Sequence, residues 1–217
     1  MQFITETGSV EVEIEALTIA GWTGRDSAVV QHHIDELAAI GVAPPSEVPL
    51  FYRVSRELLT QASKIEMLGS GSSGEAEPMI VNIDGQIWLG LGSDHTDRDL
   101  EAHSVAASKQ ICAKPCAESL WNFNDVQDHL DVITVQSWIY EADDWILYQD
   151  GTLGQIIALD SLLEQAPLGP QSAMMCGTFG AIGGVRPAAK FRARMHDPVR
   201  NTQIELAYTA RNLPVIS

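Results

Sequence analysis

The stretch over residues 69–101 constrains the fold most, because it has the pattern of two strands joined by a tight turn. Residues 75–83 become almost wholly apolar after an opening Glu-x-Glu pair. The Asp84-Gly85 pair that follows is typical of a two-residue hairpin turn, and residues 87–90 form the return strand. The stretch therefore predicts an antiparallel hairpin.

Three carboxylates are expected at the open end of this hairpin. Side chains alternate along a strand, so Glu75 and Glu77 point to one face, and the return strand can place Asp94 beside them. Converging carboxylates suit a hard cation that prefers oxygen ligands, namely Mg²⁺, Mn²⁺ or Ca²⁺. Taken alone, a Glu-x-Glu pair is more often a solvated acidic strand edge, so the metal hypothesis depends on the other motifs.

The charge balance limits the partners that the protein can have. The 217 residues hold 13 basic and 29 acidic side chains, a formal net charge of −16. Such a surface argues against nucleic acid and against an anionic membrane. An anionic substrate then needs a bound cation or a basic cluster in its site. Three cysteines and no evident leader or membrane span indicate a soluble cytoplasmic protein.

The rest of the chain predicts a β-rich α+β fold with enough apolar residues for one sizeable domain. Alternating or continuous apolar runs predict strands over residues 10–14, 17–24, 49–53, 131–140, 145–149, 173–177, 189–195 and 202–209. Helices or helical turns are expected over residues 28–40, 57–63, 100–109 and 151–166.

A possible acid/base pair lies on the first expected helix. His33 and Glu36 are three residues apart and therefore share a helical face. Such a pair can orient an imidazole and move a proton at neutral pH. The alternative is an exposed helix that carries a histidine and a glutamate by chance.

Two basic residues and a glycine-rich loop are candidates for binding an anion. Arg98 and Lys109 flank the acidic turn, where they either neutralise the carboxylates or bind a substrate carboxylate. Residues 177–184 either cradle an anion, with backbone N–H groups and the Thr178 hydroxyl, or form a simple tight turn.

The cysteines offer a weaker alternative. Cys112, Cys116 and His103 have irregular spacing and no evident fourth ligand for zinc, so buried structural thiols are expected. The sequence also contains no Gly-x-Ser-x-Gly nucleophile elbow.

In their order along the chain, these motifs resemble the fumarylacetoacetate hydrolase superfamily, whose metal-dependent enzymes act on oxo-acids. The segments that carry the resemblance are 20–25, His33-x-x-Glu36, 45–51, Glu75-x-Glu77, 92–101, Lys109, 148–152 and 176–179. The chain also departs from the family pattern. Arg53 stands where the family usually has lysine, Glu101 replaces glutamine, and Lys109 and Lys114 are both candidates for a later family lysine.

The resemblance implies a mixed β-sandwich or roll of the superfamily's C-terminal domain type, and a homodimer. It implies a single catalytic domain over residues 1–217, with N-terminal strands and a lid-like helix (28–40) in residues 1–45 and a mixed β core in 46–217. It also implies Mg²⁺ or Mn²⁺ held by Glu75, Glu77 and Asp94.

The resemblance further assigns roles to the other motifs. His33, oriented by Glu36, would activate water or move a proton, and Lys109 would help neutralise the substrate. The implied substrate-binding residues are Arg98, Thr178, Gly177 and Arg53.

The implied reaction is hydrolytic cleavage of a carbon–carbon bond in a short, anionic, acylpyruvate-like oxo-acid, through a metal-stabilised enolate. Decarboxylation, isomerisation and dehydration in the same site are alternatives. A hypothesis of another class is a catalytically silent relative that binds a small acid or serves in assembly.

Overall fold

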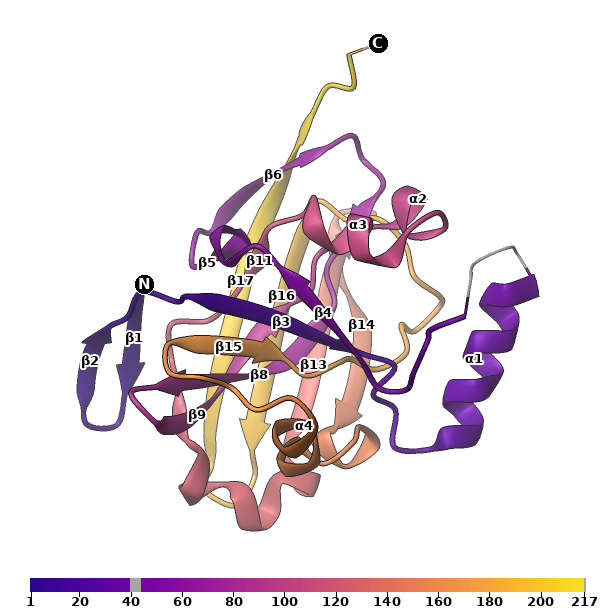
Figure 1. Cartoon of the computed structure of the whole chain (residues 1–217). Coiled ribbons are helices and arrows are strands. Elements are labelled where there is room, and N and C mark those ends of the chain that lie inside the picture. Colours follow the sequence, from indigo (N-terminus) through magenta and orange to yellow (C-terminus); the bar gives the residue numbers. More distant parts are fainter. Residues whose placement is uncertain (40–43, 217) are drawn as a thin grey trace.

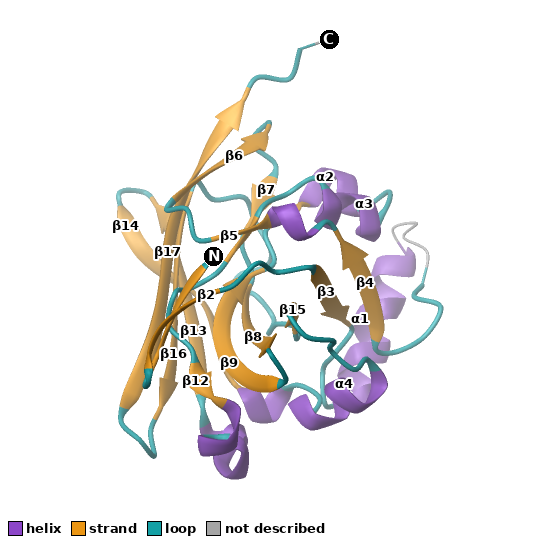
Figure 2. Ribbon diagram, turned by 60° about the vertical axis from the view of Figure 1, so that its left-hand side comes forward, coloured by secondary structure: helices purple, strands orange, loops and turns teal. Residues whose placement is uncertain are grey.

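Two packed sheets make up most of the fold (Figures 1 and 2). The computed structural model describes residues 1–39 and 44–216, without the side chains of His33, Glu36, Leu37 and Ala39. From edge to edge, the six-stranded sheet contains β12 (Trp121–Asn122), β9 (Gln86–Ser93), β8 (Ala76–Ile83), β15 (Ser172–Met175), β3 (Ala16–Gly21) and β4 (Leu50–Val54). The five-stranded sheet contains β14 (Asp144–Thr152), β13 (Thr134–Glu141), β16 (Lys190–Asp197), β17 (Thr202–Leu213) and β6 (Lys64–Leu68).

Short elements surround the sheets. Three two-stranded pairs join β1 (Gln2–Thr5) to β2 (Gly8–Glu11), β7 (Ser72–Ser73) to β10 (Thr96–Asp97), and β5 (Leu59–Thr60) to β11 (Lys114–Pro115). The α-helices are α1 (Ser27–Ala39), α2 (Arg98–Glu101), α3 (Val105–Gln110) and α4 (Leu159–Gln165). Both views place α2 and α3 near β4, at one edge of the six-stranded sheet (Figures 1 and 2). Within the described residues, no helix combines the length and apolar composition that a membrane span requires.

The predicted hairpin is present as β8 and β9. Asp84 and Gly85 have φ values of 52° and 93°, the left-handed conformations that a two-residue turn between twisted strands requires. The register pairs Ala76 with Ser93, and one step further the Asp94 N–H donates to the Glu75 carbonyl oxygen at 3.0 Å. The turn thus fixes which residues face each other at the open end.

The β8 strand separates two hydrophobic clusters. All eight of its residues are buried, as expected for a strand that is covered on both faces. Ile80 packs into the cluster shared with the five-stranded sheet, which includes Val135 and Phe191. Its neighbour Met79 packs into a second cluster with Leu17 of β3. Alternation along one strand therefore ties the two halves of the fold together.

Most predicted elements are present, with two corrections. The helical turn expected over residues 57–63 is wrong, because a short 3₁₀ turn (Arg56–Leu58) leads directly into β5. The N-terminal strand ends at Glu11, so the buried side chains of Val12 and Ile14 lie outside it. Residue 40 of the predicted helix lies outside the described residues.

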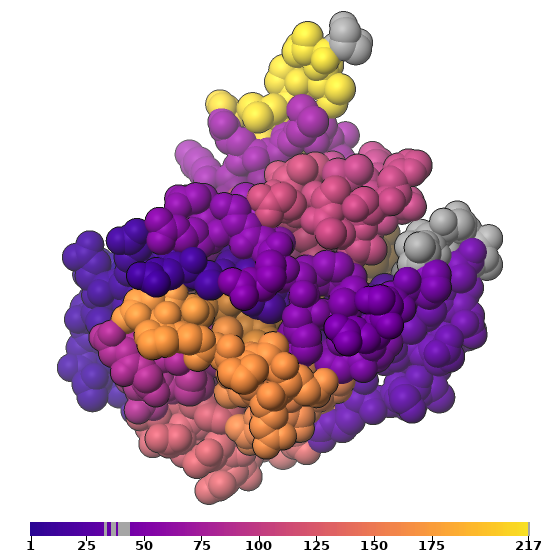
Figure 3. All heavy atoms as spheres, viewed as in Figure 1, coloured from indigo at the N-terminus to yellow at the C-terminus, as the bar shows by residue number. Residues whose placement is uncertain are grey.

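The C-terminal end of the chain stands away from the body of the molecule (Figures 1 and 3). Val215 and Ile216, just after β17, are 67% and 85% exposed. This end therefore adds little to either cluster.

Removal of a core side chain tests this packing. Leu89 of β9 is fully buried in the cluster between the sheets, so Leu89→Ala should lower the free energy of unfolding by about 2–5 kcal/mol. Leu68→Ala is the matched control, because Leu68 is 54% exposed and its loss should cost less than about 1 kcal/mol. Urea unfolding measures both, and equal effects would show that the core is wrongly placed.

Candidate functional site

The three predicted carboxylates come together at the open end of the β8–β9 hairpin. Oxygen atoms of Glu75, Glu77 and Asp94 lie within 4.8 Å of one another. Ser93 points to the opposite face, where its hydroxyl contacts the Tyr208 hydroxyl of the five-stranded sheet at 2.9 Å. The carboxylates therefore face away from that sheet. Asp94 is completely buried and Glu77 is 2% exposed, so the cluster is not a solvated strand edge.

Two buried lysines neutralise Asp94. The Lys109 ammonium, on α3, donates to Asp94 Oδ2. Lys114 Nζ, on β11, lies 3.1 Å from Asp94 Oδ1 and donates to the His95 carbonyl oxygen at 2.6 Å. Burial by itself raises the pKa of Asp94, but the two ammonium groups outweigh it and hold that pKa below its usual range. Both candidates for the family lysine thus lie at the cluster.

Glu77 is held by the glycine-rich loop. Its Oε2 accepts a hydrogen bond from the Gly177 N–H at 2.9 Å. Burial, followed by the negative charge of Asp94, raises the pKa of Glu77 well above its usual value. Gly177 has a φ of 98°, and a Cβ there would lie 1.6 Å from Thr23 Oγ1. This approach explains why glycine occupies the position.

Thr178 joins the loop to the carboxylate strand. Its hydroxyl donates to the Ala76 carbonyl oxygen at 2.8 Å and accepts from Gln149 Nε2 at 2.6 Å. Gln149 Oε1 in turn accepts from the Ala76 N–H at 2.9 Å. The sequence did not single out Gln149, although it lies in the 148–152 segment that carries the resemblance. Only the packing of the two sheets shows that its side chain reaches β8.

Arg98 holds Glu75 in place. Its guanidinium lies 3.3 Å from Glu75 Oε1 and 2.9 Å from Glu101 Oε2, and its Nε donates to Ser73 Oγ at 2.8 Å. Its side chain is only 12% exposed. Burial lowers the pKa of Arg98, but the charges of Glu75 and Glu101 more than offset this and raise it. The contacts agree with the alternative in which Arg98 supports the carboxylates.

Of the predicted site residues, Arg53 is not joined to the cluster by any contact in the described part of the chain. The side chains of His33 and Glu36 lie outside the described residues. Arg53 is exposed on β4, and because strand side chains alternate it leaves the strand on the opposite side from Tyr52. Tyr52 itself is near the cluster, since Lys109 Nζ lies 5.8 Å from the centre of its ring.

The cysteines are buried, as expected. Burial raises the pKa of the Cys112 thiol to about 11 and those of Cys116 and Cys176 still further. Among the described histidine, cysteine, aspartate and glutamate side chains, those of Glu75, Glu77 and Asp94 lie close enough together to hold a metal ion. The zinc alternative built on Cys112, Cys116 and His103 gains no support.

The carboxylate triad fits a hard divalent cation. All its donor atoms are carboxylate oxygens, the ligands that Mg²⁺, Mn²⁺ and Ca²⁺ prefer. Asp94 Oδ1 is buried and accepts no well-directed hydrogen bond within the described part of the chain, although Lys114 Nζ lies 3.1 Å from it. Both Asp94 oxygens thus already have an ammonium group beside them.

A cavity of about 210 Å³ lies near the cluster, although none of the three carboxylates lines it. Its walls include Trp22, Leu50, Tyr52, Glu101 and His103. Tyr52 and Glu101 connect it to the site, because they lie against Lys109 and Arg98 respectively. The cavity is therefore linked to the cluster indirectly, through these two side chains.

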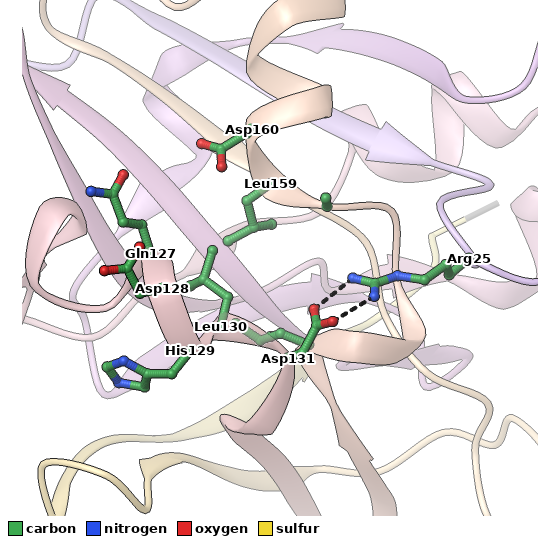
Figure 4. A pocket seen from close by; sticks show the side chains of 10 residues that line it. Arg25, Gln127, Asp128, His129, Leu130, Asp131, Leu159 and Asp160 are labelled. Carbon is green, nitrogen blue, oxygen red and sulfur yellow. Dashed lines mark hydrogen bonds and ion pairs between the residues drawn. The ribbon is translucent and has the colours of Figure 1, made fainter.

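A second cavity, of about 240 Å³, lies elsewhere. Figure 4 shows its polar lining, with the guanidinium of Arg25 facing the carboxylate of Asp131 at 2.7 Å. His129, Asp128 and Asp160 also line it, and none of the three clustered carboxylates does. It is therefore separate from the candidate site.

Comparison with solved structures shows a shared fold. The chain resembles Cg1458 (TM-score 0.66, 15% identity, 93% of this chain and 78% of that chain). It also resembles 2-keto-3-deoxy-D-arabinonate dehydratase complexed with magnesium and 2,5-dioxopentanoate (TM-score 0.65, 11% identity, 93% of this chain and 74% of that chain). A third similar structure is maleylpyruvate hydrolase from Sphingobium sp. SYK-6 (TM-score 0.59, 11% identity, 92% of this chain and 72% of that chain). The predicted β-rich α+β fold of the fumarylacetoacetate hydrolase C-terminal domain type is confirmed.

Sequence comparison gives a family. No curated protein matches the sequence. The profile of the family described as "Protein of unknown function (DUF2848)" matches residues 20–208, which include all three clustered carboxylates, both lysines and the Gly177–Thr178 loop. The chain therefore belongs to the DUF2848 family.

Proposed function

We propose that the protein is a metal-dependent enzyme of the fumarylacetoacetate hydrolase superfamily that acts on a small anionic oxo-acid. The observation that carries this proposal is the convergence of Glu75, Glu77 and Asp94, whose oxygen atoms lie within 4.8 Å of one another in a buried place. The similar structures add support, since one is a dehydratase with magnesium and a dioxo-acid and another is a maleylpyruvate hydrolase.

A bound Mg²⁺ or Mn²⁺, or Ca²⁺ as a third candidate, would polarise a substrate carbonyl and stabilise an enolate. The protein supplies the surrounding charge. Lys109, Lys114 and Arg98 balance the three carboxylates, so a divalent cation would make the cluster net positive. In a chain with a net charge of −16, this local reversal is what an anionic substrate requires.

We further propose that the nearby cavity takes up the carbon chain of the substrate. At about 210 Å³ it is smaller than the 300–1,000 Å³ that is typical of pockets for drug-sized ligands, so a short acid fits it better than a long one. Trp22, Leu50 and Tyr52 offer apolar and aromatic surface to a carbon chain. The oxo-acid end would then point to the carboxylate cluster.

The proposed reaction is hydrolytic cleavage of a carbon–carbon bond in an acylpyruvate-like compound, with dehydration, decarboxylation and isomerisation as alternatives. His33, oriented by Glu36 on α1, is the proposed acid/base. The proposed role of Gly177 and Thr178 is to hold Glu77 in position, in addition to any contact with the substrate. Gly177 donates its N–H to Glu77, and Thr178 donates its hydroxyl to the Ala76 carbonyl oxygen of the same strand. Five expectations stay predictions: a substrate contact by Arg53, a lid function of helix 28–40, a homodimer, a single catalytic domain and a cytoplasmic location.

Metal binding should stabilise the folded protein. At 100 times the dissociation constant, Mg²⁺ or Mn²⁺ adds about 2.7 kcal/mol, which raises Tm by roughly 5–10 °C in a chain of this size. Asp94→Asn and Glu75→Gln should lose the shift, whereas Asp131→Asn, a carboxylate of the separate cavity, should keep it. Calorimetry gives the Tm of each variant with and without metal, so that each shift is taken relative to the same variant without metal. An unchanged wild-type Tm would contradict the metal site.

Activity should depend on His33 but not on its neighbour. With Mg²⁺ and a panel of acylpyruvates and oxaloacetate, His33→Ala should lower kcat on the best substrate by about 10²–10⁴-fold, the usual contribution of general acid/base catalysis. His32→Ala, one residue away, is the matched control and should keep most activity. Equal rates for His33→Ala and wild type would remove His33 from the mechanism. Metal binding without turnover of any compound would favour the silent small-acid-binding alternative.

A further inference from the structure

Lys109 differs from the other cations of the site in its position. Its ammonium binds Asp94 Oδ2, and the charges that act on it are those of all three clustered carboxylates, Asp94 first and then Glu75 and Glu77. The pKa of Lys114 is lowered, first by burial and then by the charge of Lys109, while Asp94 acts to raise it. In the contacts themselves, Lys109 binds Asp94 Oδ2, whereas Lys114 lies beside Oδ1 and also binds the His95 carbonyl oxygen.

This position conflicts with a divalent ion. A cation held by the triad needs an oxygen from each carboxylate at about 2.0–2.6 Å. The Lys109 ammonium binds Asp94 Oδ2 and Lys114 Nζ lies 3.1 Å from Oδ1, so an ion that binds Asp94 meets an ammonium at either oxygen. Two cations so close together in a buried place repel each other strongly. Lys109 and the ion thus compete for the same negative charge.

The two lysines also differ in their freedom to move. Lys114 is fully buried and anchored by its hydrogen bond to the His95 carbonyl oxygen. The Lys109 side chain is 8% exposed and lies on the side of Tyr52, which lines the nearby cavity. A flexible lysine stem can swing toward that ring while keeping its charge near aromatic surface.

We propose that Lys109 is a tethered cation, which fills the carboxylate cluster until a divalent ion binds and displaces it from Asp94 toward the cavity. The inference rests on the proposed function, since it takes Glu75, Glu77 and Asp94 to be the ligands. Once displaced, the ammonium lies between the ion and the cavity, where it meets the carboxylate of an acid substrate. Lys109 is thus a positioning residue before metal binding and a substrate contact after it.

Calorimetric titration of the full chain with Mn²⁺ tests the displacement. Lys109→Met keeps the length of the side chain but removes the competing charge, and it should bind Mn²⁺ about tenfold or more tightly than the wild type. Lys109→Arg keeps the charge and should bind no more tightly than the wild type. Lys190→Met, which removes an exposed lysine of β16, is the control and should leave the affinity unchanged. Without metal, Lys109→Met should have a lower Tm than the wild type, because the carboxylates lose their cation.

The outcomes separate the inference from the proposed function. If wild type binds Mn²⁺ and Lys109→Met binds it equally or more weakly, displacement is wrong although the metal site stands. If neither wild type nor any variant binds Mn²⁺, both proposals fall. A crystal structure of the wild type with Mn²⁺ gives an answer that does not depend on how the variants fold. Lys109 Nζ should lie more than about 3.5 Å from Asp94 Oδ2, and a retained hydrogen bond would overturn the proposal.

Discussion

Burial of negative charge at the end of the β8–β9 hairpin is the constraint on which the arrangement around the site depends. Asp94 has no exposed surface and Glu77 almost none, and a buried carboxylate is stable only when it is paired or protonated. Lys109, Lys114 and Arg98 meet this need from α3, β11 and α2. The short helices and the small parallel pair β5–β11 thus serve to bring three cations to one hairpin.

A second set of contacts holds the strand itself. Gln149 bonds to the backbone of Ala76 and to Thr178, so β14 of one sheet is joined to β8 of the other next to the carboxylates. Ser93 bonds to Tyr208 on the face turned toward the five-stranded sheet. Both contacts come from the five-stranded sheet and tie the hairpin end to it, which limits how far the carboxylates can move apart.

The sequence predicts the hairpin well because its turn chemistry is local. Asp84-Gly85 sets the register, and the register alone decides that residue 94 faces residue 75. The remaining site depends on contacts between residues far apart in the chain, which no period or turn signal encodes. Lys114 was one of two candidates, and the chain pattern could not show that both lysines reach Asp94. Gln149 and Tyr52 were not predicted as site residues, since their contacts depend on how distant segments of the chain pack together. The 57–63 turn was predicted wrongly because pairing of β5 with β11 overrides local helical preference.

The contact of Gly177 with Thr23 links two parts of the site mechanically. Thr23 lies between β3 and α1, and its backbone oxygen accepts from the Ile157 N–H at 2.7 Å, so this connection is held firmly. Gly177 packs against the Thr23 side chain and donates a hydrogen bond from its N–H to Glu77. A short series of contacts thus connects the segment before α1 to a carboxylate of the cluster, from Thr23 through Gly177 to Glu77. A change in the angle at which the chain enters α1 would be transmitted to Glu77 without passing through the cavity.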